Sequence, residues 1–401
     1  MEPEVQPPPF VRPPAKTGEA LTPADNLSVP PELPVPTPEA LEYRGLRWIF
    51  IGPNGLRAGW SVTIFILLIG ILGAAIGAIF ASLHLVDFSK RNDFTPRAAF
   101  FGEALSFLAL VSAAGLVALI ERRRSLLAFN LTGPRRTFHF VSGLVGGFAA
   151  LSALMGSLAW GGWLHFGPVA LSGSEIFRFG AFWACAFLLV GCVEEGVFRC
   201  YLQFTLTRGI NFWWALGIIA ALCGSLMLRS RGNGVWGVYL IALLGLLPCL
   251  WVHLAKRPGG GFWQAAWVTS TLFGYIHTGN NGENWIGIFA AAGIGFVFCV
   301  SIWATGSAWW AIGCHAAWDW GETYFYGAAD SGNVATGHYL TTNPVGNPFW
   351  SGGADGPEGS VLILGIILLL LVALIAIYGR KRSSALVAPV VGHGAGLANA
   401  S

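Results

Sequence analysis

The stretch LLVGCVEEGVFRCYLQ, residues 188–203, places Glu194, Glu195 and Arg199 inside an otherwise apolar run. Apolar runs dominate the whole chain, because 54% of its 401 residues are hydrophobic and only 11% are charged. Soluble globular proteins carry about a quarter charged residues, and the mean hydropathy of +0.62 also departs from that class. The composition therefore predicts a protein that crosses the lipid bilayer several times. A net charge of +3 with scattered Lys and Arg gives no reason to expect nucleic-acid binding.

Apolar segments long enough to span a bilayer, at roughly 20 residues each, recur along the chain. They predict an all-α bundle of about ten transmembrane helices. Glycines, as in SGLVGGF at 142–148, are expected to let these helices pack closely. The predicted segments are 60–84, 98–120, 138–163, 179–206, 211–228, 234–254, 262–280, 285–304, 306–326 and 360–379.

The loops between these segments predict an orientation. Five arginines lie in the connection 121–136, whereas the connection 327–359 contains no Lys or Arg. Cytoplasmic loops carry an excess of Lys and Arg. We therefore expect 121–136 and the C-terminal tail 380–401 to be cytoplasmic, together with the N-terminus. The connection 327–359 is then the non-cytoplasmic loop, and 360–379 is the last transmembrane helix.

The N-terminal end differs in composition from the rest. Residues 1–43 contain 12 of the 22 prolines, which predicts a disordered tail rather than part of a packed core. Residues 44–178 would then hold the N-terminal transmembrane helices. The seven cysteines fall in apolar runs without metal-ligand spacing and are interpreted as small apolar core residues.

The three charges of the opening stretch have different explanations. Glu195 and Arg199 are four residues apart, so they can form an ion pair on one helical face. Glu194 lies about 100° around the helix from Glu195, and this pair does not account for it. A carboxylate at the centre of a membrane helix costs about 2.5–3.5 kcal/mol on insertion scales and is a functional candidate.

Two later segments offer partners for Glu194. TLFGYIHTGN (271–280) carries His277, and AIGCHAAWDWGE (311–322) carries His315 and Asp319 four residues apart. No HExxH zinc motif and no GxGD aspartate pair occurs in the chain. The remaining set consists of glutamates, histidines and an aspartate in an otherwise charge-poor sequence.

Taken together, the motifs EEGVFR (194–199), FGYIH (273–277) and HAAWD (315–319) resemble the CPBP family of intramembrane proteases. This family includes the CAAX prenyl endopeptidases and bacteriocin-processing or immunity-related (Abi-like) membrane proteins. The resemblance covers residues 179–326, which we interpret as a catalytic core. Two features depart from the family pattern: Cys200 replaces a common glycine, and an apparent helical hairpin is inserted near 209–261.

The resemblance implies a role for each motif residue. Glu194 would be the general base that activates a water, and His277 would hold and polarise that water. His315 and Asp319 would stabilise the oxyanion, while Glu195, paired with Arg199, would support the catalytic set. The implied substrate is a membrane-tethered peptide or a lipidated protein, and the implied location is a bacterial cytoplasmic membrane.

The sequence leaves open one alternative for the catalytic chemistry and two for the function. A divalent metal such as zinc, held by Glu194, His277 and His315, is an alternative to metal-free catalysis. A non-catalytic scaffold or immunity protein of the same fold is an alternative function. A proton- or ion-coupled transporter is a third, since buried Glu and His side chains also mark such pathways.

Overall fold

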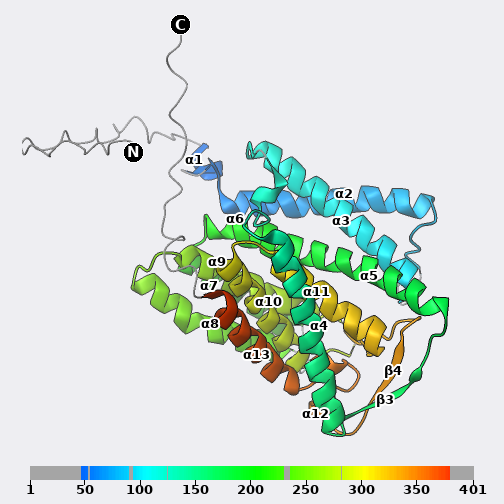
Figure 1. Cartoon of the computed structure of the whole chain (residues 1–401). Coiled ribbons are helices and arrows are strands. Elements are labelled where there is room, and N and C mark those ends of the chain that lie inside the picture. Colours follow the sequence, from blue (N-terminus) through cyan, green and yellow to red (C-terminus); the bar gives the residue numbers. More distant parts are fainter. Residues whose placement is uncertain are drawn as a thin grey trace, which may run out of the picture. The chain divides into compact units, whose positions relative to one another are not determined.

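The computed structural model describes residues 47–52, 55–89, 94–123, 125–229, 235–280 and 282–379. The description below concerns the unit Ile49–Ser401. The predicted tails 1–43 and 380–401 lie outside the described residues. The fold is helical, as the composition predicts, and Figure 1 shows its helices in sequence order.

Each of the ten predicted segments forms a helix. Two of them continue through π-helical turns: α5 runs through η3 (Gly196–Leu202) into α6 (Gln203–Thr207), and α11 runs into η5 (Trp320–Tyr326). The ten are α2 (Ala58–Ser82), α3 (Pro96–Ile120), α4 (Arg136–Trp160), α5 (Ser174–Glu195), α7 (Phe212–Arg229), α8 (Trp236–Leu254), α9 (Gly260–His277), α10 (Trp285–Thr305), α11 (Trp309–Asp319) and α13 (Leu362–Tyr378). Short elements are α1 (Arg47–Phe50), η2 (Leu126–Ala128), α12 (Pro348–Ser351) and η6 (Pro357–Gly359).

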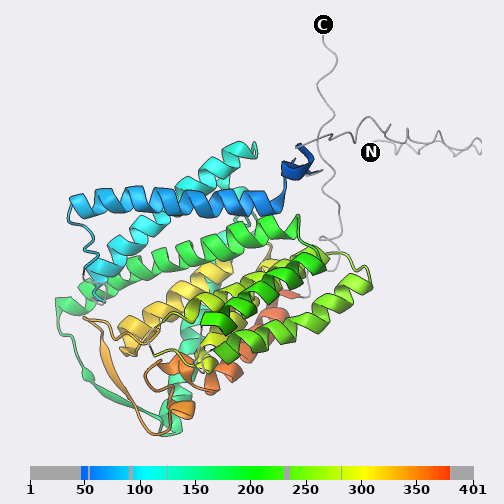
Figure 2. The same cartoon turned by 180° about the vertical axis from the view of Figure 1, so that it is seen from behind.

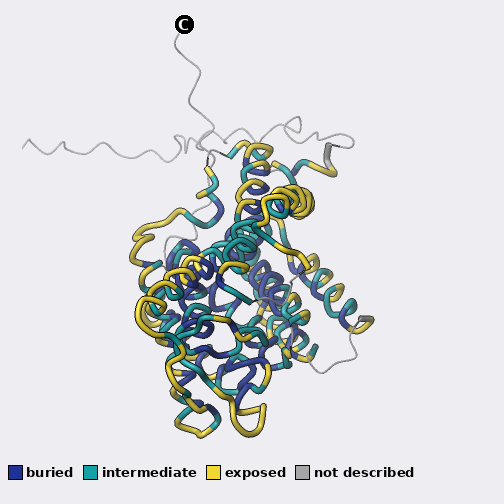
Figure 3. The backbone as a smooth tube through the Cα atoms, turned by 90° about the vertical axis from the view of Figure 1, so that its right-hand side faces the viewer, coloured by how far each residue is buried: buried dark blue, intermediate teal, exposed yellow. Residues whose placement is uncertain are grey.

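The helices differ in how well they suit a lipid environment. Among the described residues, six are long and apolar enough to cross a membrane: α2, α3, α4, the continuous segment Ser174–Thr207, α8 and α10. Helices α7 and α13 are apolar but shorter. Helices α9 and α11 complete the predicted set, and most of their residues are buried by neighbouring helices. Figure 3 shows this distribution, with buried turns concentrated inside and exposed turns outside.

Short strands, which the sequence pattern did not predict, join the connections between helices. Strand β3 (Leu164–Val169) pairs antiparallel with β4 (Leu340–Pro344) and contains a register shift between Phe166 and Val169. Strands β1 (Ile51–Gly52) and β2 (Gly55–Leu56) form a second, smaller pair. The β3–β4 pair joins the α4–α5 connection to the long connection 327–359, so both lie at the same end of the bundle (Figure 1).

Helices α4 and α11 approach each other backbone to backbone. A Cβ on Gly147 of α4 would collide with the carbonyl oxygen of Cys314, and one on Gly143 would collide with that of Trp310. Small residues at this contact allow an approach that larger side chains would prevent. The contact sets the position of α11, which carries His315.

The inserted hairpin lies beside α9. Helices α7 and α8 pack against each other and against α9, and Figure 2 shows them at the front of the view. Phe212 and Ala215 of α7 share a small core with Trp267 of α9. Helix α10 begins beside the C-terminal end of α7 and the N-terminal end of α8, where Ile288 packs with Leu226 and Val238. There the Asn284 side chain accepts hydrogen bonds from the backbone N–H groups of Ile286 and Gly287. This cap fixes the start of a helix that packs against α9.

Candidate active site

The two glutamates end a regular helix. Glu194 and Glu195 are the last residues of α5, and the π-helical η3 that follows contains Arg199. The helix of the third motif, HAAWD, has the same form, because α11 ends at Asp319 and π-helical η5 begins at the next residue. π-Helical turns are rare and often occur at functional sites. Both motifs therefore lie where helix geometry changes.

Glu195 and Arg199 form an ion pair in the protein interior. Nε of Arg199 lies 3.2 Å from Oε2 of Glu195, and both side chains are 0% exposed. The guanidinium carbon also lies 4.3 Å from the ring centroid of Phe273, where a cation–π interaction adds to the pairing. A Cβ on Gly295 of α10 would lie 2.5 Å from Nη2 of Arg199, so this glycine makes room for the guanidinium.

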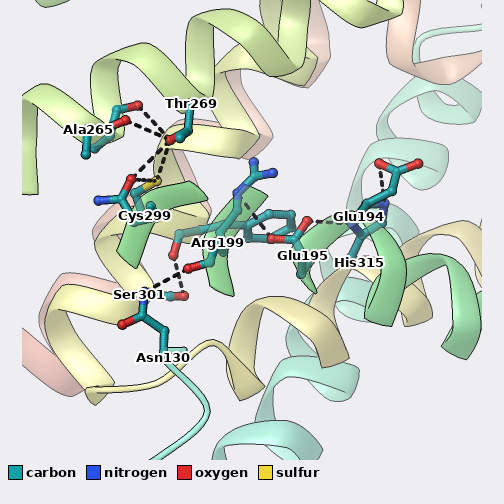
Figure 4. Close-up of polar contacts among 12 residues, drawn as sticks. Asn130, Glu194, Glu195, Arg199, Ala265, Thr269, Cys299, Ser301 and His315 are labelled. Atoms are coloured by element: carbon teal, nitrogen blue, oxygen red, sulfur yellow. Dashed lines mark hydrogen bonds and ion pairs between the residues drawn. The ribbon is translucent and has the colours of Figure 1, made fainter. Parts of the chain in front are cut away.

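Glu195 has a second partner, His315. Its Oε1 lies 2.8 Å from Nδ1 of His315, so the glutamate connects the arginine to the histidine, as Figure 4 shows. Nε2 of His315 then lies 3.8 Å from Oε2 of Glu194 and 3.5 Å from Oδ2 of Asp319. A carboxylate that accepts from one ring nitrogen fixes the orientation of the ring and the direction of the other nitrogen.

His277 is held by its own helix. Its Nδ1 lies 2.7 Å from the carbonyl oxygen of Phe273, one turn earlier in α9. A carbonyl oxygen can only accept, so Nδ1–H is the donor, and Nε2 of the neutral ring carries the lone pair. Its ring packs against that of Phe273, with centroids 4.6 Å apart. The first aromatic residue of the motif FGYIH therefore contacts both Arg199 and His277.

A cavity of about 260 Å³ connects these motifs. Glu194, His277, His315 and Asp319 all line it, and apolar side chains such as Phe187 and Ile294 form much of the remaining wall. The structure thus brings together four residues that are up to 125 positions apart in the chain. Glu195 and Arg199 do not line the cavity and are fully buried behind it. Glu195 contacts His315 from this position, and Arg199 contacts Glu195.

Three further carboxyl groups line the same cavity. Glu103 comes from α3, Asp330 from the connection after η5, and Glu358 from η6. The sequence contained a signal for Glu103, because it is a carboxylate within a predicted transmembrane segment, like Glu194. Asp330 and Glu358 lie in a loop with ordinary loop composition, and only the tertiary structure brings them to the site.

The zinc site considered from the sequence would need at least three ligand side chains close together. Among the described residues, no three His, Cys, Asp or Glu side chains lie in positions that could hold a metal ion. We therefore assign no reaction step to a metal.

A family model described as type II CAAX prenyl endopeptidase Rce1-like matches residues 177–257 and 248–321. Searches of curated proteins and of solved structures found no match. The matched part contains the three motifs and the inserted hairpin, and its bounds are close to the 179–326 expected from the motifs. Residues 177–321 thus match the family of type II CAAX prenyl endopeptidases, which confirms the resemblance that the three motifs predict.

Proposed function

We propose that this protein is an intramembrane endopeptidase, in which Glu194 activates a water to hydrolyse a peptide bond of a membrane-associated or lipidated substrate. The observation that carries the proposal is the cavity that Glu194, His277, His315 and Asp319 line together. The match to the type II CAAX prenyl endopeptidases supports the class of reaction. A cavity that lies between apolar helices suits a substrate that is already in the bilayer.

Glu194 is the best-placed base. Its side chain is 33% exposed, whereas that of Glu195 is 0% exposed, so only Glu194 has access to a water in the cavity. As the water oxygen bonds to the carbonyl carbon, its proton passes to Glu194. The same carboxyl group then gives this proton to the leaving nitrogen as the C–N bond breaks.

The histidines have separate roles in this mechanism. His315, fixed through Nδ1 by Glu195, directs Nε2 toward Glu194 and Asp319 and donates from it to the oxyanion when that nitrogen is protonated. His277 presents Nε2 to the water, because its Nδ1 is engaged by the Phe273 carbonyl. Asp319 orients His315. The ion pair of Arg199 with Glu195 positions His315 without touching the substrate.

We also propose that the protein lies in a bacterial cytoplasmic membrane with both termini in the cytoplasm. The arginines of the connection 121–136 support this orientation. The described helices support an integral membrane protein by their length and composition.

The test is cleavage of a panel of membrane-tethered and prenylated peptides by the purified protein in liposomes. We expect Glu194→Gln and His315→Ala to lose activity by at least about 100-fold, the usual loss for a general base or an oxyanion donor. Glu175→Gln and His165→Ala are matched controls, because both residues are exposed and lie outside the cavity. Both controls should keep wild-type activity.

Other outcomes separate the alternatives. Activity that chelators abolish and zinc restores would contradict the metal-free mechanism. No cleavage by folded wild-type protein over the whole panel would contradict the enzyme and favour the scaffold or immunity role. Proton or ion flux across proteoliposomes that depends on Glu194, without cleavage, would favour a transporter.

A further inference from the structure

The cavity wall is strongly acidic. Five carboxyl groups line it, from Glu103, Glu194, Asp319, Asp330 and Glu358. No Lys or Arg is among the described lining residues, and the two histidines are the only basic side chains there. Glu194 and Asp319 have roles in the proposed reaction, but Glu103, Asp330 and Glu358 have none. Their presence requires a separate explanation, because buried carboxylates are costly without a cationic partner.

Asp330 and Glu358 lie on connections at one end of the bundle. Asp330 follows η5, and its Oδ2 accepts a hydrogen bond from Thr323 Oγ1 at 2.8 Å. Glu358 is in η6, and its Oε1 accepts one from Trp318 Nε1 at 2.8 Å. Both positions are fixed by these bonds, so the two carboxyl groups are held at the wall rather than swinging on a loose loop.

A second observation concerns Glu322, next to the wall. Its Oε2 lies 2.9 Å from the same Trp318 Nε1 that donates to Glu358, so two carboxyl groups share one N–H donor. Glu322 is 0% exposed, and its Oε1 has no hydrogen-bond partner within the described part of the chain. Glu322 itself does not line the cavity, but Glu358 does, and it shares its Trp318 donor with Glu322, so a donor inside the cavity would complete the hydrogen bonding of Glu358.

The pKa shifts of Asp330 and Glu358 show that the protein itself supplies little compensation for their negative charge. Burial raises the pKa of Asp330 above its ordinary value. Burial, and then repulsion from Asp330, raises the pKa of Glu358 well above its ordinary value. A positive charge beside these two carboxyl groups would lower both pKa values and favour the ionised forms.

The shape of the site favours an organic cation over a metal ion. No described set of three acidic, histidine or cysteine side chains could hold a metal. The same cavity has apolar walls, including Ile363 and Ile367 of α13. A lysine or arginine side chain has the matching character, with an apolar stem and a charged head.

We propose that Asp330 and Glu358 bind a lysine or arginine side chain of the substrate while the peptide bond lies at Glu194. The inference rests on the proposed function, since it names the class of peptide that the same cavity accepts. It also predicts that a peptide with an acidic residue at this position binds more weakly, because its carboxylate would face the carboxyl groups of Asp330 and Glu358.

The test compares the binding of two series of membrane-tethered peptides that carry either lysine or acetyl-lysine at successive positions. Acetylation removes the charge and keeps most of the side chain. Affinities are measured by fluorescence anisotropy on the Glu194→Gln protein, which keeps the peptides intact, and the preference is checked on the wild type. At one position we expect lysine to bind about tenfold more tightly than acetyl-lysine. Asp330→Asn combined with Glu358→Gln should remove this preference.

Glu175→Gln is the matched control, and it should keep the preference, because Glu175 is exposed and pairs with Arg178 outside the cavity. The single variants Asp330→Asn and Glu358→Gln give the same readout if the double variant fails to fold, and each should reduce the preference. Equal binding of lysine and acetyl-lysine peptides at every position would overturn the inference, whether or not the peptides are cleaved. Stabilisation of the wild type by Ca²⁺ or Mg²⁺ alone, with loss of lysine-peptide binding, would overturn it in favour of a metal site. Cleavage is scored separately, so its absence counts only against the proposed function.

Discussion

Replacement of Arg199 by methionine tests whether the buried ion pair holds the site together. Arg199 and Glu195 are both 0% exposed and 3.2 Å apart, and no other arginine or lysine contacts Glu195 among the described residues. Arg199→Met leaves the glutamate charge in the bundle with His315 as its remaining partner. Breaking a buried pair from one side costs about 3–5 kcal/mol. Because His315 offsets part of this loss, we expect a decrease of about 3 kcal/mol in the free energy of unfolding.

The measurement is equilibrium unfolding in mixed detergent micelles, made on Arg199→Met, Glu195→Gln and the double variant. The double variant carries no unpaired charge, so it should be more stable than Arg199→Met, with a coupling of about 1–3 kcal/mol between the two sites. Arg178→Met is the control, since Arg178 is 69% exposed and its pair with Glu175 is worth at most about 1 kcal/mol. Equal losses for Arg199→Met and Arg178→Met would refute the reasoning. Activity should stay low in the double variant, because His315 loses its carboxylate.

Two further predictions concern packing and pH. Gly147→Ala should destabilise the protein by about 1–3 kcal/mol and lower activity, because its Cβ would collide with the Cys314 carbonyl next to His315. Gly156→Ala, with open space around the new Cβ, should be neutral in the same thermal unfolding assay. Burial, and then repulsion from Asp355, raises the pKa of Glu283 to about 9, so folded protein binds a proton that unfolded protein releases near pH 4.5. Stability should therefore fall as pH rises from about 4.5 toward 9, and Glu283→Gln should remove part of that fall; an unchanged pH profile of the thermal midpoint would contradict this assignment.

Some residues of the candidate site could be predicted from the sequence, and others could not. Glu194, His277 and His315 were detectable because polar side chains are conspicuous in apolar helices, where their cost requires a purpose. The spacing of Glu195 and Arg199 indicated a pair on one helical face, and the structure has that pair. The spacing could not indicate that Glu195 also contacts His315, since that contact joins helices 120 residues apart. Glu103 carried a signal of the same kind as Glu194 and was not selected.

The sequence by itself determined that the chain is a bundle of apolar helices and which polar residues within them are candidates for chemistry. Both follow from local properties: apolar length and the cost of burying charge. Only the tertiary structure decided that α4 and α11 touch through glycines, that Glu195 lies behind the cavity while Glu194 lines it, and that loop residues Asp330 and Glu358 reach the site. These features depend on which helical faces meet, and neither hydropathy nor spacing along one helix specifies a partner in another.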